Sequence, residues 1–134
     1  MPINGSSIME GATGITITAG SAKTYTQSGL KVSNGINVID ASVASVTTRP
    51  SMTFKSNPAT VDSKTGKWGR ESREAIATRP KVLTDLSQEF PAIRVKANLH
   101  PEMTQAEIFA LRIMACQMIM DSDFDSFWNT GSQS

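Results

Sequence analysis

The chain has 134 residues, of which 39% are hydrophobic and 19% charged, and its formal net charge is +1. This length is typical of one domain with a core of its own, and a single cysteine and a single histidine exclude an intrachain disulfide and a zinc cluster. Residues 49–96 hold ten basic and five acidic side chains, whereas residues 97–134 hold one basic and five acidic. This division favours a surface for a polyanion such as nucleic acid, although uneven surface charge is common.

Three short strands are predicted in the first 40 residues. Residues 1–12, rich in glycine and serine, are expected to form a flexible arm. Alternating isoleucine and threonine over 14–18, and a Thr- and Tyr-rich stretch over 22–27, predict an N-terminal hairpin. An Asn-Gly turn signal opens the segment 34–40, NGINVID, which predicts a third strand.

The middle of the chain predicts the main strands of an antiparallel sheet. The segment 49–58, RPSMTFKSNP, alternates, and its polar side carries Arg49, Ser51, Thr53 and Lys55. Residues 62–69 are predicted to be a turn or long hairpin loop, 72–80 a fourth strand of unknown register, and 81–88 a connection of uncertain form. The last strand, 89–99, alternates Ile93, Val95, Ala97 and Leu99 with Arg94, Lys96 and Asn98.

A helix is predicted from about residue 104 to residue 120. Thr104 followed by Glu107 is a capping-box pattern before an apolar run. The run carries two apolar stripes, Ile108, Leu111, Ala115, Met118 and Ile119, and Phe109, Ile113, Cys116 and Met120. Cys116 is expected to be a small core residue rather than a reactive thiol. Residues 121–129 begin with capping residues and predict a short second helix. We expect no signal peptide and no membrane span.

Strands followed by two helices predict a segregated α+β domain, with helices on one face of an antiparallel sheet. The polar sides of 49–58 and 89–99 then lie on the other face. Their four cations, with hydroxyls, an amide and no carboxylate between them, would form a surface for phosphates and exposed bases. A solvated sheet face is the competing interpretation.

The helix at 104–120 predicts a dimer. Because it is apolar on both flanks, it must be covered on both, and its own sheet covers only one. A second copy related by a two-fold axis is the economical cover, and the expected interface residues are Ile108, Phe109, Leu111, Ala115, Met118 and Ile119. The alternative is a monomer in which the N-terminal hairpin folds over the helix.

In this pattern the chain resembles the coat protein of single-stranded RNA bacteriophages, the levivirus group, from about residue 13 to residue 130. The resemblance is carried by NGINVID, RPSMTFKSNP, REAIATRPKV, the 89–99 strand and HPEMTQAEIFALRIM. It implies a single coat-protein domain over 1–134, with a flexible arm at 1–12, a hairpin and five-stranded antiparallel sheet over 13–99, and two helices over 104–129. It also implies an intertwined homodimer with a continuous sheet.

The resemblance further implies that dimers close into an icosahedral T=3 shell, the capsid of a virion assembled in the cytoplasm of a bacterial host. A single-stranded RNA genome would lie against the inner sheet face. There an operator hairpin could bind and repress translation. By position the RNA-binding residues would be Arg49, Ser51, Thr53, Lys55 and Phe90, and the basic residues of the last strand add Arg94 and Lys96.

The chain departs from that family at the same face. Phe90 stands where the stacking aromatic is more often tyrosine, so it can stack but cannot donate a hydroxyl hydrogen bond. Ala92 stands where a polar contact is common, and Glu74 and Ile76 stand where lysines and threonines do. General RNA packaging is therefore a firmer expectation than recognition of one hairpin. The resemblance also implies that the 81–88 loop would lie at the symmetry axes of the shell.

An enzyme is not expected. His100, between Leu99 and Pro101, has no evident partner for acid–base or nucleophilic work. Asp121, Asp123 and Asp125 lack the glycine and distal glutamate of a calcium loop and are interpreted as helix-capping acids. No metal, cofactor, membrane or small-molecule substrate is predicted. The alternative function is a dimeric, sheet-faced RNA- or DNA-binding regulator that builds no shell.

Overall fold

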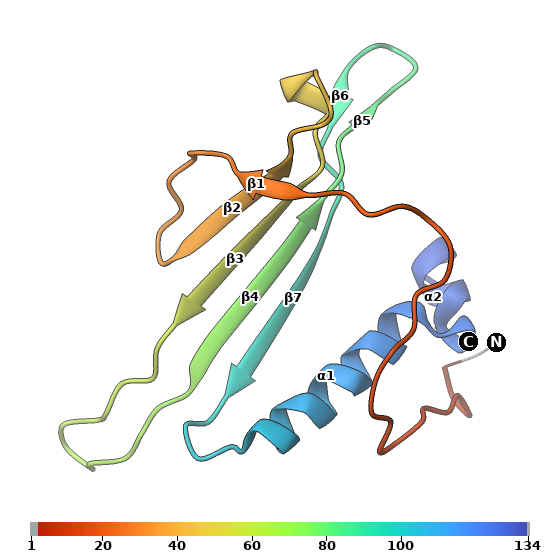
Figure 1. Cartoon of the computed structure of the whole chain (residues 1–134). Coiled ribbons are helices and arrows are strands. Elements are labelled where there is room, and N and C mark those ends of the chain that lie inside the picture. The colour runs from red at the N-terminus through yellow and green to blue at the C-terminus, as the bar shows by residue number, and fades with distance from the viewer. Residues whose placement is uncertain (1–2, 134) are drawn as a thin grey trace. The chain divides into compact units, whose positions relative to one another are not determined.

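The computed structural model describes residues 3–133; residues 1 and 2 of the predicted arm, and residue 134, lie outside the described residues. The chain divides into two compact units (Figure 1). The sheet unit is Gly20–Glu102, and the helical unit combines the N-terminal segment up to Ala19 with the chain from Met103 onward.

The sheet unit holds a five-stranded antiparallel sheet in the order β1-β2-β3-β4-β7 (Figure 1). Its strands are β1 (Tyr25–Gln27), β2 (Gly35–Asp40), β3 (Ser51–Asn57), β4 (Glu71–Thr78) and β7 (Ala92–Leu99). A 3-10 turn, η1 (Val46–Thr48), precedes β3, and a small hairpin of β5 (Lys81–Val82) and β6 (Gln88–Glu89) connects β4 to β7. Together with two C-terminal helices, this sheet confirms the predicted α+β class.

The register divides the sheet into two faces of opposite character, because paired residues in neighbouring strands share a face and successive residues alternate. We call one the polar face; it carries Asn37, Ser51, Thr53, Lys55, Glu74, Ile76, Thr78, Arg94 and Lys96. We call the other the apolar face; it carries Ile36, Val38, Met52, Phe54, Ala75, Ala77, Ile93 and Val95.

A close approach of β2 to β3 depends on glycine. Asn34 adopts a left-handed conformation with φ of 55°, and the Gly35 N–H donates to Val32 O at 3.2 Å, which forms the predicted Asn-Gly turn. A Cβ atom at Gly35 would overlap the carbonyl oxygen of Phe54. Gly35 therefore lets β2 begin directly opposite Lys55.

The predicted strand at 14–18 is wrong. Ile15 and Ile17 are 49% and 86% exposed, and the segment pairs with no strand in the described chain. The hairpin at this end of the sheet is formed by β1 and β2 instead, with Thr26 opposite Ile39. Alternation shows only that a segment suits a pleated surface; pairing needs a free neighbouring edge as well.

The helical unit contains α1 (Gln105–Met120), a 3-10 turn η2 (Ser122–Phe124) and α2 (Asp125–Thr130). The predicted capping box is confirmed, because Thr104 Oγ1 accepts from Glu107 N at 3.2 Å and Glu107 Oε1 accepts from Thr104 N at 3.5 Å. Trp128 Nε1 donates to Met118 O at 2.8 Å and fastens α2 to the end of α1. No helix in the described residues is long and apolar enough to cross a membrane.

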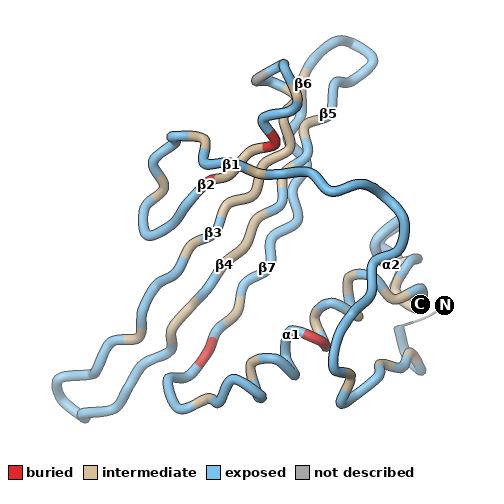
Figure 2. Tube along the Cα trace, viewed as in Figure 1, coloured by how far each residue is buried: buried red, intermediate tan, exposed pale blue. Residues whose placement is uncertain are grey.

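Little of the described chain is buried (Figure 2). Leu99 and Ile113 are its buried hydrophobic residues, at 3% and 8% exposure. Cys116, expected in the core, is exposed. A domain of this size normally buries most of the surface that its unfolded chain exposes, so the single chain leaves much apolar surface without a cover.

Candidate functional site

The polar face brings together the basic residues of two strands that are distant in sequence. Lys55 of β3 pairs with Glu74 of β4, and Glu74 pairs with Lys96 of β7, so the three form one row across the sheet. The next row is Thr53, Ile76 and Arg94. Four predicted site residues, Thr53, Lys55, Arg94 and Lys96, therefore lie on one face within two adjacent rows, and Ser51 lies on the same face one row further along β3.

The prediction that no carboxylate interrupts these cations is wrong. Glu74 lies between Lys55 and Lys96, and its Oε1 lies 3.0 Å from Arg94 Nη1. The Glu74 side chain is 18% exposed and that of Arg94 is 65% exposed. The register places Glu74 and Ile76 on this face, in agreement with the expectation from the family resemblance. The alternation within 72–80 alone is too weak to define that register.

A buried amide supports the β3 side of the face. Asn37, at 6% exposure, donates through Nδ2 to Thr53 Oγ1 at 2.9 Å and accepts at Oδ1 from Ser28 Oγ at 2.7 Å. The network fixes the position of the Thr53 hydroxyl oxygen, whose own hydrogen is left for another acceptor. Sequence reasoning missed Asn37, although its place among the apolar residues of NGINVID is the signal of a buried polar group.

Arg49 does not belong to β3, which begins at Ser51. Its Nε donates to Val43 O at 2.6 Å and its Nη2 lies 3.4 Å from Ala44 O. The planar guanidinium thus holds the backbone at 43–44 in place, because its N–H groups donate to two successive carbonyl oxygens. The prediction that Arg49 lies on the polar face of this strand is therefore wrong.

Phe90 lies before the start of β7 rather than within the predicted 89–99 strand. It is 61% exposed, so its ring is accessible for stacking. The peptide after it is fixed, since Arg79 N donates to Pro91 O at 3.1 Å. The 81–88 connection is a hairpin in which Ser87 donates to Asp85 Oδ1 from both its N–H, at 3.0 Å, and its hydroxyl, at 2.6 Å.

Large side chains of the apolar face are partly exposed. Ile36, Phe54 and Ile93 are 40%, 44% and 45% exposed. A hollow of about 380 Å³ lies over one end of this face, where Tyr25, Met52, Ala77 and Ile93 line it. Exposed apolar patches of this kind mark interaction surfaces in soluble proteins.

Helix α1 is likewise incompletely covered. Of the predicted interface residues, Phe109, Leu111 and Met118 are 38%, 46% and 48% exposed, and Ile108, Ala115 and Ile119 are partly buried. Sequence reasoning did not include Met114 in either stripe, and it is also exposed. Ile113, which sequence reasoning assigned to the second stripe, is the residue of α1 that is buried within its own chain.

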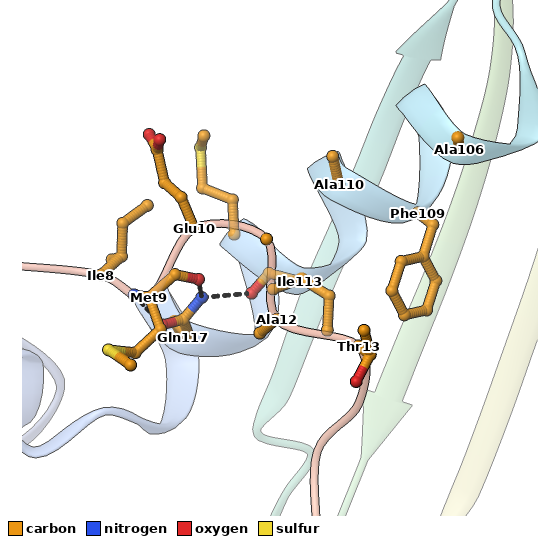
Figure 3. Close-up of a pocket in the computed structure, with 12 residues that line it drawn as sticks. Ile8, Met9, Glu10, Ala12, Thr13, Ala106, Phe109, Ala110, Ile113 and Gln117 are labelled. Atoms are coloured by element: carbon orange, nitrogen blue, oxygen red, sulfur yellow. Dashed lines mark hydrogen bonds between the residues drawn. The ribbon is translucent and has the colours of Figure 1, made fainter.

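The N-terminal segment lies along α1 and encloses an apolar pocket of about 420 Å³ (Figure 3). Met9 N donates to Gln117 Oε1 at 2.6 Å, and Gln117 Nε2 donates to Met9 O at 3.1 Å. Ser7 N also donates to Asp123 Oδ2 at 3.2 Å. Ile8, Ala12, Phe109 and Ile113 are among the residues that line the pocket. Part of the predicted arm is thus hydrogen-bonded to the helices.

The carboxylates of Asp121 and Asp123 accept hydrogen bonds from the backbone. Asp121 accepts from Asp123 N at 2.9 Å and caps η2, as the sequence indicated. Among the described residues no group of three or more metal-ligating side chains comes together. His100 Nδ1 accepts from Glu102 N at 3.1 Å within the turn before α1.

Two solved structures resemble this chain along nearly its whole length. One, titled "Virus-like particle of bacteriophage GQ-907", is 35% identical with a TM-score of 0.92, and the match covers 98% of this chain and 99% of that chain. The other, titled "Virus-like particle of bacteriophage AVE019", is 13% identical with a TM-score of 0.66 over 92% and 98% of the two chains, and it shows the fold alone. No protein-family model and no curated protein matches the chain.

Proposed function

The chain belongs to the family of bacteriophage coat proteins, and from this premise we propose that it forms homodimers that close into an icosahedral T=3 shell around a single-stranded RNA genome. Its role is structural, in a capsid. The observation that carries the proposal is the division of one sheet into a polar face with Lys55, Arg94 and Lys96 and an apolar face whose large side chains are partly exposed.

The dimer is supported by surfaces that a single copy leaves unsatisfied. Leu111 and Met118 of α1, and Phe54 and Ile93 of the apolar face, are all more than a third exposed. Full burial of a wholly exposed side chain of this kind stabilises by about 1.5–3 kcal/mol, and each of these four still has a little under half of its surface to bury. β7 is also an edge strand of the sheet, and its outer backbone groups can pair with the β7 of a second copy. A two-fold axis at this edge would join two sheets into one.

RNA is the partner that the polar face suits. Lys55, Arg94 and Lys96 supply charge for phosphates, and Ser51 and Thr53 supply hydroxyl donors next to Lys55 along the same face of β3. Phe90, exposed before β7, supplies a ring on which a base can stack. In this proposal the polar face is the inner surface of a shell assembled in the cytoplasm of a bacterial host.

Recognition of one operator hairpin, with repression of translation, is the finer part of the proposal. It needs contacts that distinguish bases, and the candidates are Phe90 and the Thr53 hydroxyl that Asn37 positions. Ala92 and Ile76 offer no hydrogen bonds from their side chains on this face. The face is therefore better equipped to package RNA in general than to select a sequence.

Expression of the chain alone in bacteria tests the proposal. We expect particles that elute as a large assembly, appear as uniform shells in electron micrographs, and contain RNA that resists nuclease until the shell is opened. A dimer that binds RNA and forms no shell under any assembly condition would assign the chain to a non-assembling nucleic-acid-binding protein instead. Empty shells assembled without any nucleic acid would contradict the RNA part alone.

A further inference from the structure

The centre of the polar face holds a carboxylate where a phosphate-binding surface needs positive charge. Glu74 lies in the row between Lys55 and Lys96, and its Oε1 is 3.0 Å from Arg94 Nη1. The side chain is mostly buried, so its charge is poorly screened by solvent. Of the three cations on this face, one is therefore already paired within the protein.

The ion pair between Glu74 and Arg94 is close in distance but is not a well-aligned hydrogen bond. Glu74 Oε1 is a buried atom without a hydrogen-bond partner of good geometry, although Arg94 Nη1 lies close to it. The Arg94 side chain is 65% exposed, so the guanidinium can turn outward without moving the backbone. When it does, Glu74 keeps two cationic cross-strand neighbours, Lys55 and Lys96. Release of Arg94 thus does not leave the carboxylate without compensation.

We propose that Glu74 sets the strength of RNA binding by competing with RNA phosphate for Arg94. This inference rests on the proposed function, since it assumes that RNA lies on the polar face. Each RNA phosphate that binds Arg94 must displace the Glu74 carboxylate, and the remaining carboxylate repels the phosphate that has taken its place. Glu74 acts on the RNA through Arg94 and is a positioning residue.

The test compares Glu74→Gln with Glu71→Gln. Glu71 is a matched control, because it lies on the same strand, on the opposite face, and forms an ion pair with Arg73 at 3.2 Å. Protein released from particles is titrated into a short fluorescent oligouridylate at several KCl concentrations, and affinity is followed by anisotropy. Both variants remove one negative charge, so a general effect of net charge appears equally in both.

For Glu74→Gln we expect tighter binding than for wild type, with a log–log salt slope steeper by about 0.7, the value of one phosphate contact on a single strand. The gain in affinity should therefore grow by roughly two- to threefold when the salt concentration falls fourfold. Glu71→Gln should follow the wild-type line. Equal behaviour of the two variants, or weaker binding by Glu74→Gln, would overturn the proposal.

A second measurement separates competition from simple repulsion. In an Arg94→Met background, which keeps the packing of the aliphatic stem, the change Glu74→Gln should have a smaller effect than in wild type. An undiminished effect would mean that Glu74 does not act through Arg94. The double variant Lys55→Ala with Lys96→Ala tests the proposed function separately. If neither Glu74→Gln nor this double variant changes RNA binding, the RNA lies elsewhere and the proposed function of this face fails.

Discussion

Asn37 donates a 2.9 Å hydrogen bond to the hydroxyl oxygen of Thr53 across β2 and β3. The same amide accepts from Ser28 at 2.7 Å, so one buried side chain links a loop, a strand and the polar face. Such a group stabilises the fold only while its partners are in place, because buried polar atoms left without partners are costly.

We expect Asn37→Ala to lower the free energy of unfolding by about 1–3 kcal/mol, since it leaves the partners without their hydrogen bonds. Urea unfolding of disassembled protein, followed by tryptophan fluorescence, measures the change. Asn57→Ala is the control, because the Asn57 side chain bonds to Ser72 at 3.2 Å on the exposed surface. Equal losses in the two variants would show that the buried network has no special weight.

Lys55 and Lys96, the two lysines on either side of Glu74, should account for part of the salt dependence of RNA binding. Changing both to Ala should leave the shell intact and reduce the slope by about 1.4, the value of two phosphate contacts on a single strand. Lys64→Ala with Lys67→Ala removes the same charge from the loop between β3 and β4 and should not change the slope. If the loop variant changes the slope as much as the strand variant does, the prediction is wrong.

Leu111 offers a test of the dimer. It is 46% exposed in the single chain, so Leu111→Asp would be tolerated in a monomer, whereas in the proposed interface a buried, unpaired carboxylate costs several kcal/mol. We expect loss of dimer and of particles, measured by light scattering. Gln105→Asp, at the exposed start of α1 where negative charge is favourable, should assemble normally. Normal dimers from Leu111→Asp would place the interface elsewhere.

The capping box of α1 predicts a stability loss that depends on one hydroxyl group. Thr104→Ala removes the acceptor for Glu107 N and should cost about 1 kcal/mol. Thr104→Ser keeps the acceptor and should recover most of that loss. Thermal unfolding followed by far-UV circular dichroism measures both. Identical melting of the two variants would show that the methyl group of Thr104, rather than its oxygen, is what matters.

Asp40 should make stability depend on pH in acid. The Ser42 hydroxyl donates to the Asp40 carboxylate, and this bond is the largest cause that holds the pKa of Asp40 below its ordinary value of 3.8. Burial opposes it and raises the pKa, whereas the Ser42 N–H and the charges of Lys23 and Arg49 lower the pKa further. A depressed pKa in the folded state stabilises above the unfolded value, and this stability is lost as the pH falls through the folded pKa.

Ser42→Ala should therefore lower the urea midpoint at neutral pH, and the difference from wild type should vanish in strong acid. Ser87→Ala is the matched control, because Ser87 makes the same two hydrogen bonds to Asp85 and likewise lowers its pKa, but in an exposed hairpin. Its effect on the midpoint should be smaller. A Ser42→Ala difference that persists unchanged at the lowest pH would mean that the hydroxyl stabilises by packing.

Much of the fold follows from local patterns. The alternation in 49–58 and 89–99 locates β3 and β7 within three residues, and the Thr104–Glu107 pattern locates the start of α1. These elements carry their own signals, namely period-two polarity and a cap. The segment 14–18 carries the same alternation and is no strand, because pairing is decided by a neighbour that the segment's own residues do not reveal.

The candidate site was predicted in composition but not in arrangement. Alternation places Lys55, Arg94 and Lys96 on polar sides, but only the register shows that Glu74 separates the two lysines. Arg49 shows the reverse error, since it lies two residues before β3 and continues the alternating pattern, while its side chain donates to a loop carbonyl. Cross-strand register depends on long-range pairing, which the sequence of one strand does not contain.

The two edges of the sheet differ greatly in length. β1 offers three residues and β7 offers eight, so one border is a poor template for another strand and the other is a good one. When two copies join symmetrically through the long border, both good templates are consumed and only the short ones remain outside. Growth by strand addition then stops at two molecules, which favours closed units over fibres.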